Sequence, residues 1–277
     1  MSTPASKSLT DADLASLREA KLLLEQPGLV ARLSNYIGQP VELLIDRLPA
    51  GSGELITKAT DQALRAALKL ALSTLKGESG TPSNRLHKIS AAASGVAGGA
   101  FGLPALTIEL PVSTTIMLRS IADIARSNGE QLTDHGAQLA CLETFALGGT
   151  GSRDDGSESG YFAARALLAR SVSDAAAYLA ANATVTEGAP ILLRLVSQIA
   201  ARFSVPVTGK VAAQSVPVVG GLGGGIINTL FISHFQDMAT GHFVVRRLER
   251  QYGPDPVKAA YDSLKIVTTG TPPDDDS

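Results

Sequence analysis

The chain lacks several features by which a protein's function is often recognised. It contains no tryptophan, and aromatic residues make up only 4% of its 277 residues. Charged residues make up 18%, below the roughly 25% of ordinary soluble domains. A core built mainly from Ala, Leu, Val and Gly favours closely packed helices over a β-sandwich. The formal charge of −2 provides no basic field, which argues against nucleic acid as a partner.

The chain has a single cysteine, and its first residues lack the pattern of a secretion signal. Cys141 is the single cysteine, which excludes an internal disulfide and a multi-cysteine zinc site. The first residues, MSTPASKSLTDADLASL, contain no apolar run of the kind a signal peptide requires. The sequence therefore predicts a cytoplasmic protein, located at the inner face of the cell membrane if it associates with one.

No segment alternates polar and apolar residues with the period of a β-strand, so we expect an all-α protein. We predict an N-terminal arm with helices in residues 1–40, a single helical domain over residues 41–267, and a disordered acidic tail over residues 268–277. Helices are expected at residues 10–26, 29–37, 41–48, 54–76, 112–127, 134–146, 161–181, 189–201, 235–251 and 256–267. Pro111 is expected to open one of these helices, and Ser204–Pro206 to end another.

Two long uncharged stretches stand out against this background. Ile89–Ile108 reads ISAAASGVAGGAFGLPALTI, and Val211–Ser233 reads VAAQSVPVVGGLGGGIINTLFIS. Each is long enough to span a bilayer as a helix. Their glycines recur three or four residues apart, which on a helix forms a flat strip for close contact with another backbone. We predict two glycine-rich helices at the centre of the domain.

Two interpretations of these stretches stay open. They are buried helices that pack on each other, or they insert into or rest on a membrane as kinked elements, because each contains a proline. Arg85 and Lys88 precede the first stretch, and Arg246, Arg247 and Arg250 follow the second, where they can meet anionic lipid headgroups. A phosphate-binding loop is not supported, because PVVGGLGGGIIN lacks the GKS or GKT sequence.

Polar residues follow each stretch and form the candidate site. After the first stretch, Arg119 and Asp123 are four residues apart and can pair on one helical face, with Glu109 as a second partner for Arg119. After the second, His234, Asp237 and His242 are weak candidates for a metal site with an acidic residue from elsewhere, although their spacing is not that of an HExxH motif. The whole candidate cluster is Glu109, Arg119, Asp123, Glu143, Asn228, His234, Asp237, His242 and Arg246.

Several strings in this chain resemble the EcsC family of bacterial proteins. The resemblance is carried by GLPALTIELPVSTTIMLRSIADIARSNGE, CLETFALGG, ESGYFAAR, ARFSVPVTGKVAAQSVPVVGG and INTLFISHFQDMATGHFVVRRLERQYG, and it extends over about Leu43–Leu264. The family takes its name from an operon that encodes an ABC transporter. It has no agreed set of catalytic residues, so the resemblance assigns none here.

The sequence favours a membrane-associated accessory protein that binds lipid or a membrane-protein partner, and it favours a non-enzyme. A metal-dependent, peptidase-like hydrolase using His234, Asp237 and His242 is one alternative, with a divalent metal as its only cofactor. A soluble protein-interaction scaffold is the other. If a site exists, we expect it where the two stretches end and their polar residues meet.

Overall fold

The computed structural model describes residues 8–25, 28–74, 105–148, 160–182, 188–216 and 222–265. Within these ranges the chain is helical and contains no strand, which confirms the predicted all-α class. The helices are α1 (Asp11–Glu25), α2 (Leu29–Ile37), α3 (Val41–Ile45), α4 (Ser52–Thr74), α6 (Leu106–Ser127), α7 (His135–Leu147), α8 (Gly160–Ala181), α9 (Pro190–Gln214), α10 (Leu222–Tyr252) and α11 (Pro254–Ser263).

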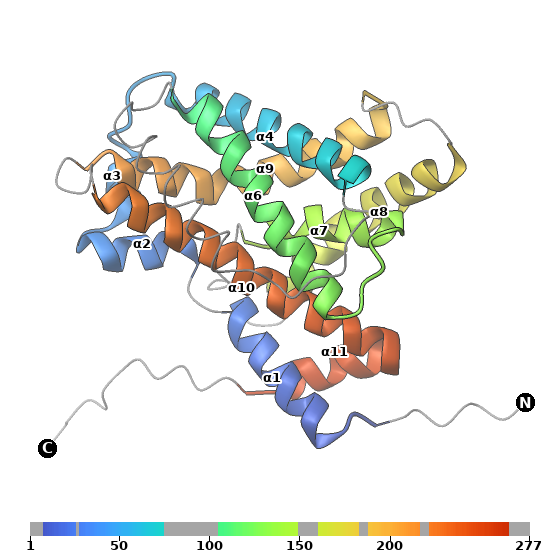
Figure 1. The fold of residues 1–277 in the computed structure, drawn as a ribbon. Coiled ribbons are helices and arrows are strands. Elements are labelled where there is room, and N and C mark those ends of the chain that lie inside the picture. Colours follow the sequence, from blue (N-terminus) through green and yellow to red (C-terminus); the bar gives the residue numbers. More distant parts are fainter. Residues whose placement is uncertain are drawn as a thin grey trace, which may run out of the picture.

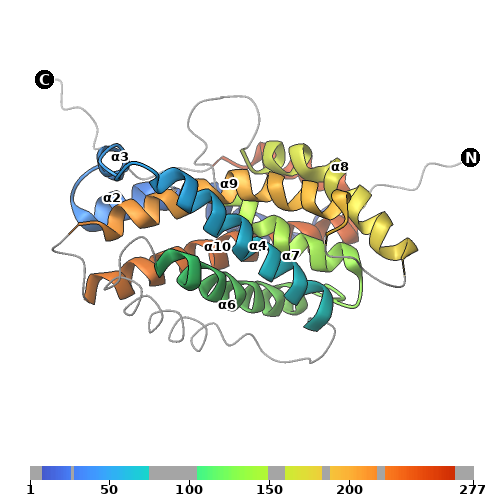
Figure 2. The same ribbon diagram turned by 90° about the horizontal axis from the view of Figure 1, so that it is seen from above.

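The helices pack around α7, which is short and buried along nearly its whole length. Asp134 caps its first turn, because the carboxylate accepts a hydrogen bond from the Ala137 N–H at 3.2 Å. Helices α4, α6, α8, α9 and α10 all contact α7, and Figures 1 and 2 show them surrounding it. Helix α7 has no polar face to turn toward water, which explains its central place.

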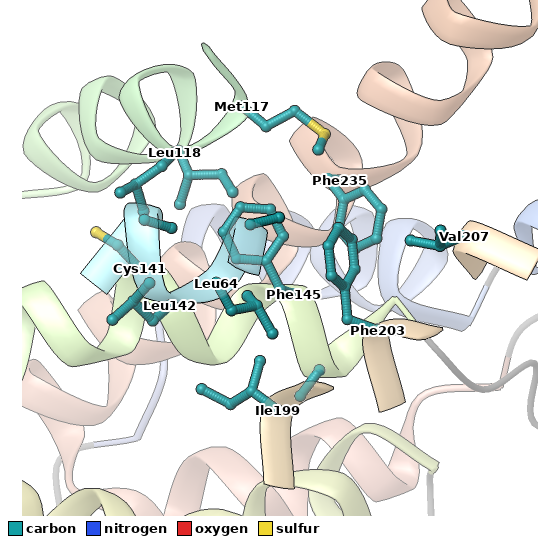
Figure 3. Close-up of a cluster of buried hydrophobic side chains, with 14 of the residues drawn as sticks. Leu64, Met117, Leu118, Cys141, Leu142, Phe145, Ile199, Phe203, Val207 and Phe235 are labelled. Atoms are coloured by element: carbon teal, nitrogen blue, oxygen red, sulfur yellow. The ribbon is translucent and has the colours of Figure 1, made fainter. Parts of the chain in front are cut away.

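The main hydrophobic core lies between α4, α6, α7, α9 and α10 (Figure 3). At its centre, the rings of Phe145, Phe203 and Phe235 lie 5.0–5.6 Å apart. The ring of Phe231 joins this cluster, which therefore contains four of the chain's seven phenylalanines. Aromatic contacts of this geometry add to the free energy of burial.

A second, smaller core joins α1, α8, α10 and α11. Helix α1 approaches α10 closely at Gly241, where an added Cβ atom would lie 2.9 Å from the Ala20 carbonyl oxygen. The chain then turns at Gly253, whose φ of 90° is in the region that glycine adopts without strain. This turn sends α11 back beside α10 (Figure 1). Helix α10 therefore contributes to both cores.

Two predicted helix boundaries are wrong, because proline does not act as a boundary in either case. Helix α6 begins at Leu106 and carries Pro111 in its interior. Helix α9 continues through Pro206 to Gln214 instead of ending near Ser204. A proline inside a helix costs about 3 kcal/mol. In α9, burial of Phe203 and Val207 on either side of the proline offsets that cost.

The prediction of two central glycine-rich helices is only partly tested. Most of the first stretch, residues 89–104, lies outside the described residues. The second stretch is not one helix: residues 211–214 end α9 and residues 222–233 begin α10, with residues 217–221 outside the described part. The predicted tail, residues 268–277, also lies outside it.

Candidate functional site

The predicted polar residues do not form one cluster. They are distributed along α10, which at 31 residues is about 46 Å long. Near its start lie Glu109 and the fully buried Asn228. Near its other end lie Glu143, His242 and Arg246, and only these three come together.

Glu109 forms a buried ion pair with Lys210, and does not pair with Arg119 as expected. The Lys210 Nζ donates to the Glu109 Oε1 at 2.6 Å, with the two side chains 0% and 8% exposed. The same Nζ lies 4.8 Å from the centre of the Phe231 ring. This contact ties the start of α6 to the end of α9 and to α10. Because both charges are compensated, the pair has a structural role.

Asp123 pairs with Arg126, three residues along α6, at 2.9 Å. Arg119 is exposed on the same helix. The predicted network between Glu109, Arg119 and Asp123 is therefore replaced by two separate pairs. Helical spacing allows the 119–123 and the 123–126 pair equally, and the tertiary surroundings select the second.

His234 and Asp237 each have a partner of their own. The His234 Nε2 lies 2.9 Å from the Gly148 carbonyl oxygen, and burial lowers the pKa of this imidazole. A neutral ring with Nε2–H as the donor fits both observations. Asp237 accepts from the Arg32 guanidinium at 3.1 Å, on a part-exposed surface between α2 and α10.

His242 lies two turns further along α10 and faces Glu143. His234, Asp237 and His242 thus point to three different partners. Within the described residues, no three His, Cys, Asp or Glu side chains lie close enough to hold a metal ion. The described part of the chain therefore gives the metal-dependent hydrolase no site.

A pocket of about 360 Å³ opens between α7, α8, α10 and α11. Its apolar lining comes from Phe162, Ala166, Ala169, Val172 and Pro254. Its charged lining comes from Glu143, Arg165, Arg246, Glu249, Asp255 and Lys258. The lining residues of α8 and α10 are spaced three or four apart, so each helix presents one face to the pocket. This is the site into which the structure gathers Glu143 and Arg246, and we call it the Glu143 pocket.

Glu143 is the residue that distinguishes this pocket. It is 5% exposed, and among the described residues its carboxyl group makes no hydrogen bond. Burial raises the pKa of Glu143, while Arg165 and Arg246 act in the opposite direction and Glu249 raises it further. The effect of burial is the largest of these, so the carboxyl group favours its neutral form more than an exposed glutamate does.

A chain of polar contacts runs from Glu143 to the far wall of the pocket. The His242 Nε2 lies 4.0 Å from the Glu143 Oε2, and the His242 Nδ1 lies 3.0 Å from the Tyr161 hydroxyl. That hydroxyl accepts from Arg165 at 3.3 Å. Arg165 in turn holds Glu249 through two bonds of 2.7 and 3.0 Å.

One tautomer of neutral His242 satisfies these contacts. Because the Tyr161 oxygen accepts from Arg165, its own O–H is free to donate to the His242 Nδ1. The hydrogen of His242 is then on Nε2, facing Glu143. Burial lowers the pKa of His242 well below its ordinary value, and Arg165 and Arg246 lower it further. His242 is therefore a neutral neighbour of Glu143.

Arg246 forms an ion pair with Glu130 and not with Glu143. Its Nε donates to the Glu130 Oε1 at 2.8 Å, and Arg250 contacts the same oxygen. Arg246 also lies 24 residues after the start of α10, about 36 Å along the helix. Contact of Arg246, Arg247 and Arg250 with lipid headgroups stays a prediction.

Cys141 is a packed thiol on α7. It is fully buried, and burial raises its pKa to about 12. The thiolate is the reactive form of cysteine. Cys141 therefore belongs to the core shown in Figure 3 and has no chemical role in the pocket.

Sequence analysis missed Lys210, Tyr161, Arg165, Glu130 and Glu249. The signal for two of them was present, since Tyr161 and Arg165 are four residues apart in the string ESGYFAAR. That spacing places both on one face of a helix. The string does not show that this face packs against α10, the helix that carries His242 and Glu249.

One comparison with known proteins finds a match that covers most of the chain. No curated protein and no solved structure matches the chain. The model of the EcsC protein family matches residues 12–248, from the start of α1 to near the end of α10. That range contains both hydrophobic cores for the most part, together with the Glu109–Lys210 pair and Glu143. The chain therefore belongs to the EcsC protein family, as the strings in its sequence predicted.

Proposed function

We propose that this EcsC-family protein associates peripherally with a membrane through the end of the molecule at which α6 and α10 begin. The observation that carries the proposal is a group of exposed aliphatic side chains there. Ile108 is 73% exposed, and Val112, four residues along the same face of α6, is 46% exposed. Ile226 on α10 is 44% exposed, and Leu43 on α3 is 54% exposed.

The starts of α6 and α10 lie at the same end of the structure. The Gln236 Nε2 donates to the Ser120 Oγ at 2.7 Å, and each of these residues is 14 positions after the first residue of its helix. Figures 1 and 2 show both starts, together with α3, at one end of the molecule. We call Leu43, Ile108, Val112 and Ile226 the aliphatic end.

The sequence around this end supports a lipid surface as the partner. Both helices begin inside the uncharged stretches Ile89–Ile108 and Val211–Ser233, so the chain that joins them to the preceding helices carries no charge over these ranges. Burying one exposed aliphatic side chain contributes about 1.5–3 kcal/mol. Several exposed aliphatic side chains next to the two uncharged stretches suit reversible attachment to a bilayer surface.

One described helix, α9, is long and apolar enough to cross a bilayer. Buried helices of water-soluble proteins share these two properties. Helix α9 also contacts α2, α3, α4, α7, α8 and α10 and carries the buried Lys210. We therefore assign membrane contact to the aliphatic end rather than to a spanning α9.

Flotation with vesicles of phosphatidylethanolamine and a minority of phosphatidylglycerol tests the proposal. We expect the wild-type protein to float with the vesicles, and the double variant Ile108→Asp/Ile226→Asp to lose at least tenfold in partition. Leu167→Asp is the matched control, because Leu167 is 70% exposed on α8, a helix that Figure 1 shows away from the starts of α6 and α10. A wild-type protein that stays in the aqueous fraction at low salt refutes the proposal. Capture of a protein partner through the same residues, without flotation, would favour the interaction scaffold.

A further inference from the structure

We propose that the Glu143 pocket binds a small organic amine, whose ammonium group pairs with the Glu143 carboxylate in the pocket lining. The inference does not rest on membrane association, because the pocket lies around the C-terminal part of α10 and the aliphatic end lies at its start. Two independent observations carry it. One is a cavity of ligand size, and the other is an unpaired acidic side chain, 5% exposed, that lines it.

The charge of the ligand follows from the pairs already made in the pocket wall. Arg165 holds Glu249 with two hydrogen bonds. Arg246 holds Glu130 at 2.8 Å, and Lys258 holds Asp262 at 3.0 Å. Every cationic side chain that lines the pocket therefore has a carboxylate partner.

The acidic side chains of the wall are not all matched in this way. Among the described residues, Glu143 and Asp255 have no cation within ion-pair distance: Glu143 has only His242, 4.0 Å away, and His242 is neutral. The charge that remains to be compensated is negative, so a cation fits. An anion would lie against Glu143 and would have to draw Arg165 or Arg246 away from a carboxylate that it already holds.

The body of the ligand follows from the rest of the lining. Phe162, Ala166, Ala169 and Val172 form an apolar wall along α8. A volume of about 360 Å³ is at the lower end of the range for small-molecule sites. A short hydrocarbon body with one ammonium group satisfies both parts of the lining. The Phe162 ring adds a surface that attracts cations, as its contact with Lys258 at 5.4 Å shows.

Binding of an amine is coupled to the ionisation of Glu143. Burial raises the pKa of Glu143, and the ammonium group stabilises the ionised form. The other titratable groups facing Glu143 are Tyr161 and Arg165 on α8, His242, Arg246 and Glu249 on α10, and Asp255 and Lys258 on α11. Arg165 and Arg246 stay charged, while burial keeps Tyr161 and His242 neutral. Affinity therefore rises with pH through the pKa of Glu143, and falls again when the amine itself loses its proton near about pH 10.

Titration calorimetry on the full chain, with n-hexylammonium as the probe, tests the proposal. Hexanoate and hexanol are the matched ligands, since they share the hydrocarbon body and differ in charge. We expect hexylammonium to bind at least tenfold more tightly than either, and Glu143→Gln to weaken it at least tenfold. Asp255→Asn is expected to weaken it about threefold. Asp174→Asn, an exposed change on α8 outside the pocket, is expected to leave it unchanged.

The outcomes that overturn the inference are equally specific. They are hexanoate binding as tightly as hexylammonium, unchanged amine binding by Glu143→Gln, and no binding of any probe at millimolar concentration. If Glu143→Gln does not fold, the affinities of the wild type for hexylammonium, hexanoate and hexanol decide the matter. Tighter binding of hexylammonium than of the other two supports the site, and equal or weaker binding contradicts it.

Discussion

Two buried glutamates in this structure have opposite surroundings. The Glu109 Oε1 lies 2.6 Å from the Lys210 Nζ, and both side chains are buried. Glu143 has a pocket beside it and, among the described residues, no hydrogen bond. Both residues are less than 10% exposed. Burial of a carboxyl group alone therefore does not mark a functional site; the missing counter-charge does, because an unpaired buried group gains most from a ligand.

The largest effect is expected at the paired glutamate. Lys210→Met removes the counter-charge and leaves the Glu109 carboxylate buried, which should lower the free energy of unfolding by about 3–5 kcal/mol. Equilibrium urea unfolding measures the change. The double variant Glu109→Gln/Lys210→Met should recover most of the loss, because it removes both charges. A single variant as stable as the wild type would show that the pair is not compensated in the way described.

A smaller loss is expected at the wall of the Glu143 pocket. Arg165→Gln breaks both bonds to Glu249 and the contact with the Tyr161 hydroxyl. Bonds to charged groups contribute about 1.5–3 kcal/mol, and this pair is only part-buried, so we expect about 2 kcal/mol. The same unfolding experiment measures it. Arg170→Gln is the control, because Arg170 is exposed on the same helix, and its loss should be close to zero.

The smallest effect has the opposite sign. Glu143→Gln replaces an unpaired buried acid with a neutral isostere and should stabilise the free protein by about 1 kcal/mol at pH 8. The folded-state pKa of Glu143 is raised, so the wild type loses stability as the pH rises from the unfolded-state pKa through the folded-state pKa. The gain from the substitution should therefore shrink as the pH falls toward 4. Thermal unfolding at several pH values measures this, and a destabilised variant at pH 8 would show that Glu143 has a structural partner.

The same comparison shows how far sequence reasoning reached. It included both Glu109 and Glu143 in the candidate polar cluster, and both are buried. It did not assign Lys210 to Glu109, since the two are 101 positions apart, and it did not place Glu143 in a pocket. Local spacing limits the contacts within a helix to a few pairs, such as Asp123 with Arg119 or Arg126. Contacts between helices depend on how the helices cross.

The prolines illustrate the same limit. Pro111 and Pro206 were expected to mark helix boundaries, and both lie inside helices. A proline inside a helix costs a similar free energy at every site. The free energy gained by burying its neighbours differs from site to site, and it cannot be derived from the sequence because it depends on the tertiary contacts.

By itself the sequence determined the helical class, the EcsC family and most of the helix positions, because these follow from composition, periodicity and short strings. Only the tertiary structure decided which of two similar buried acids is neutralised, and that Arg246 is held by Glu130 far from the second uncharged stretch. The physical reason is that electrostatic compensation is a property of distance in space. Helix α10 runs past both glutamates, and the side chains that the neighbouring helices bring to each one decide whether its charge is compensated.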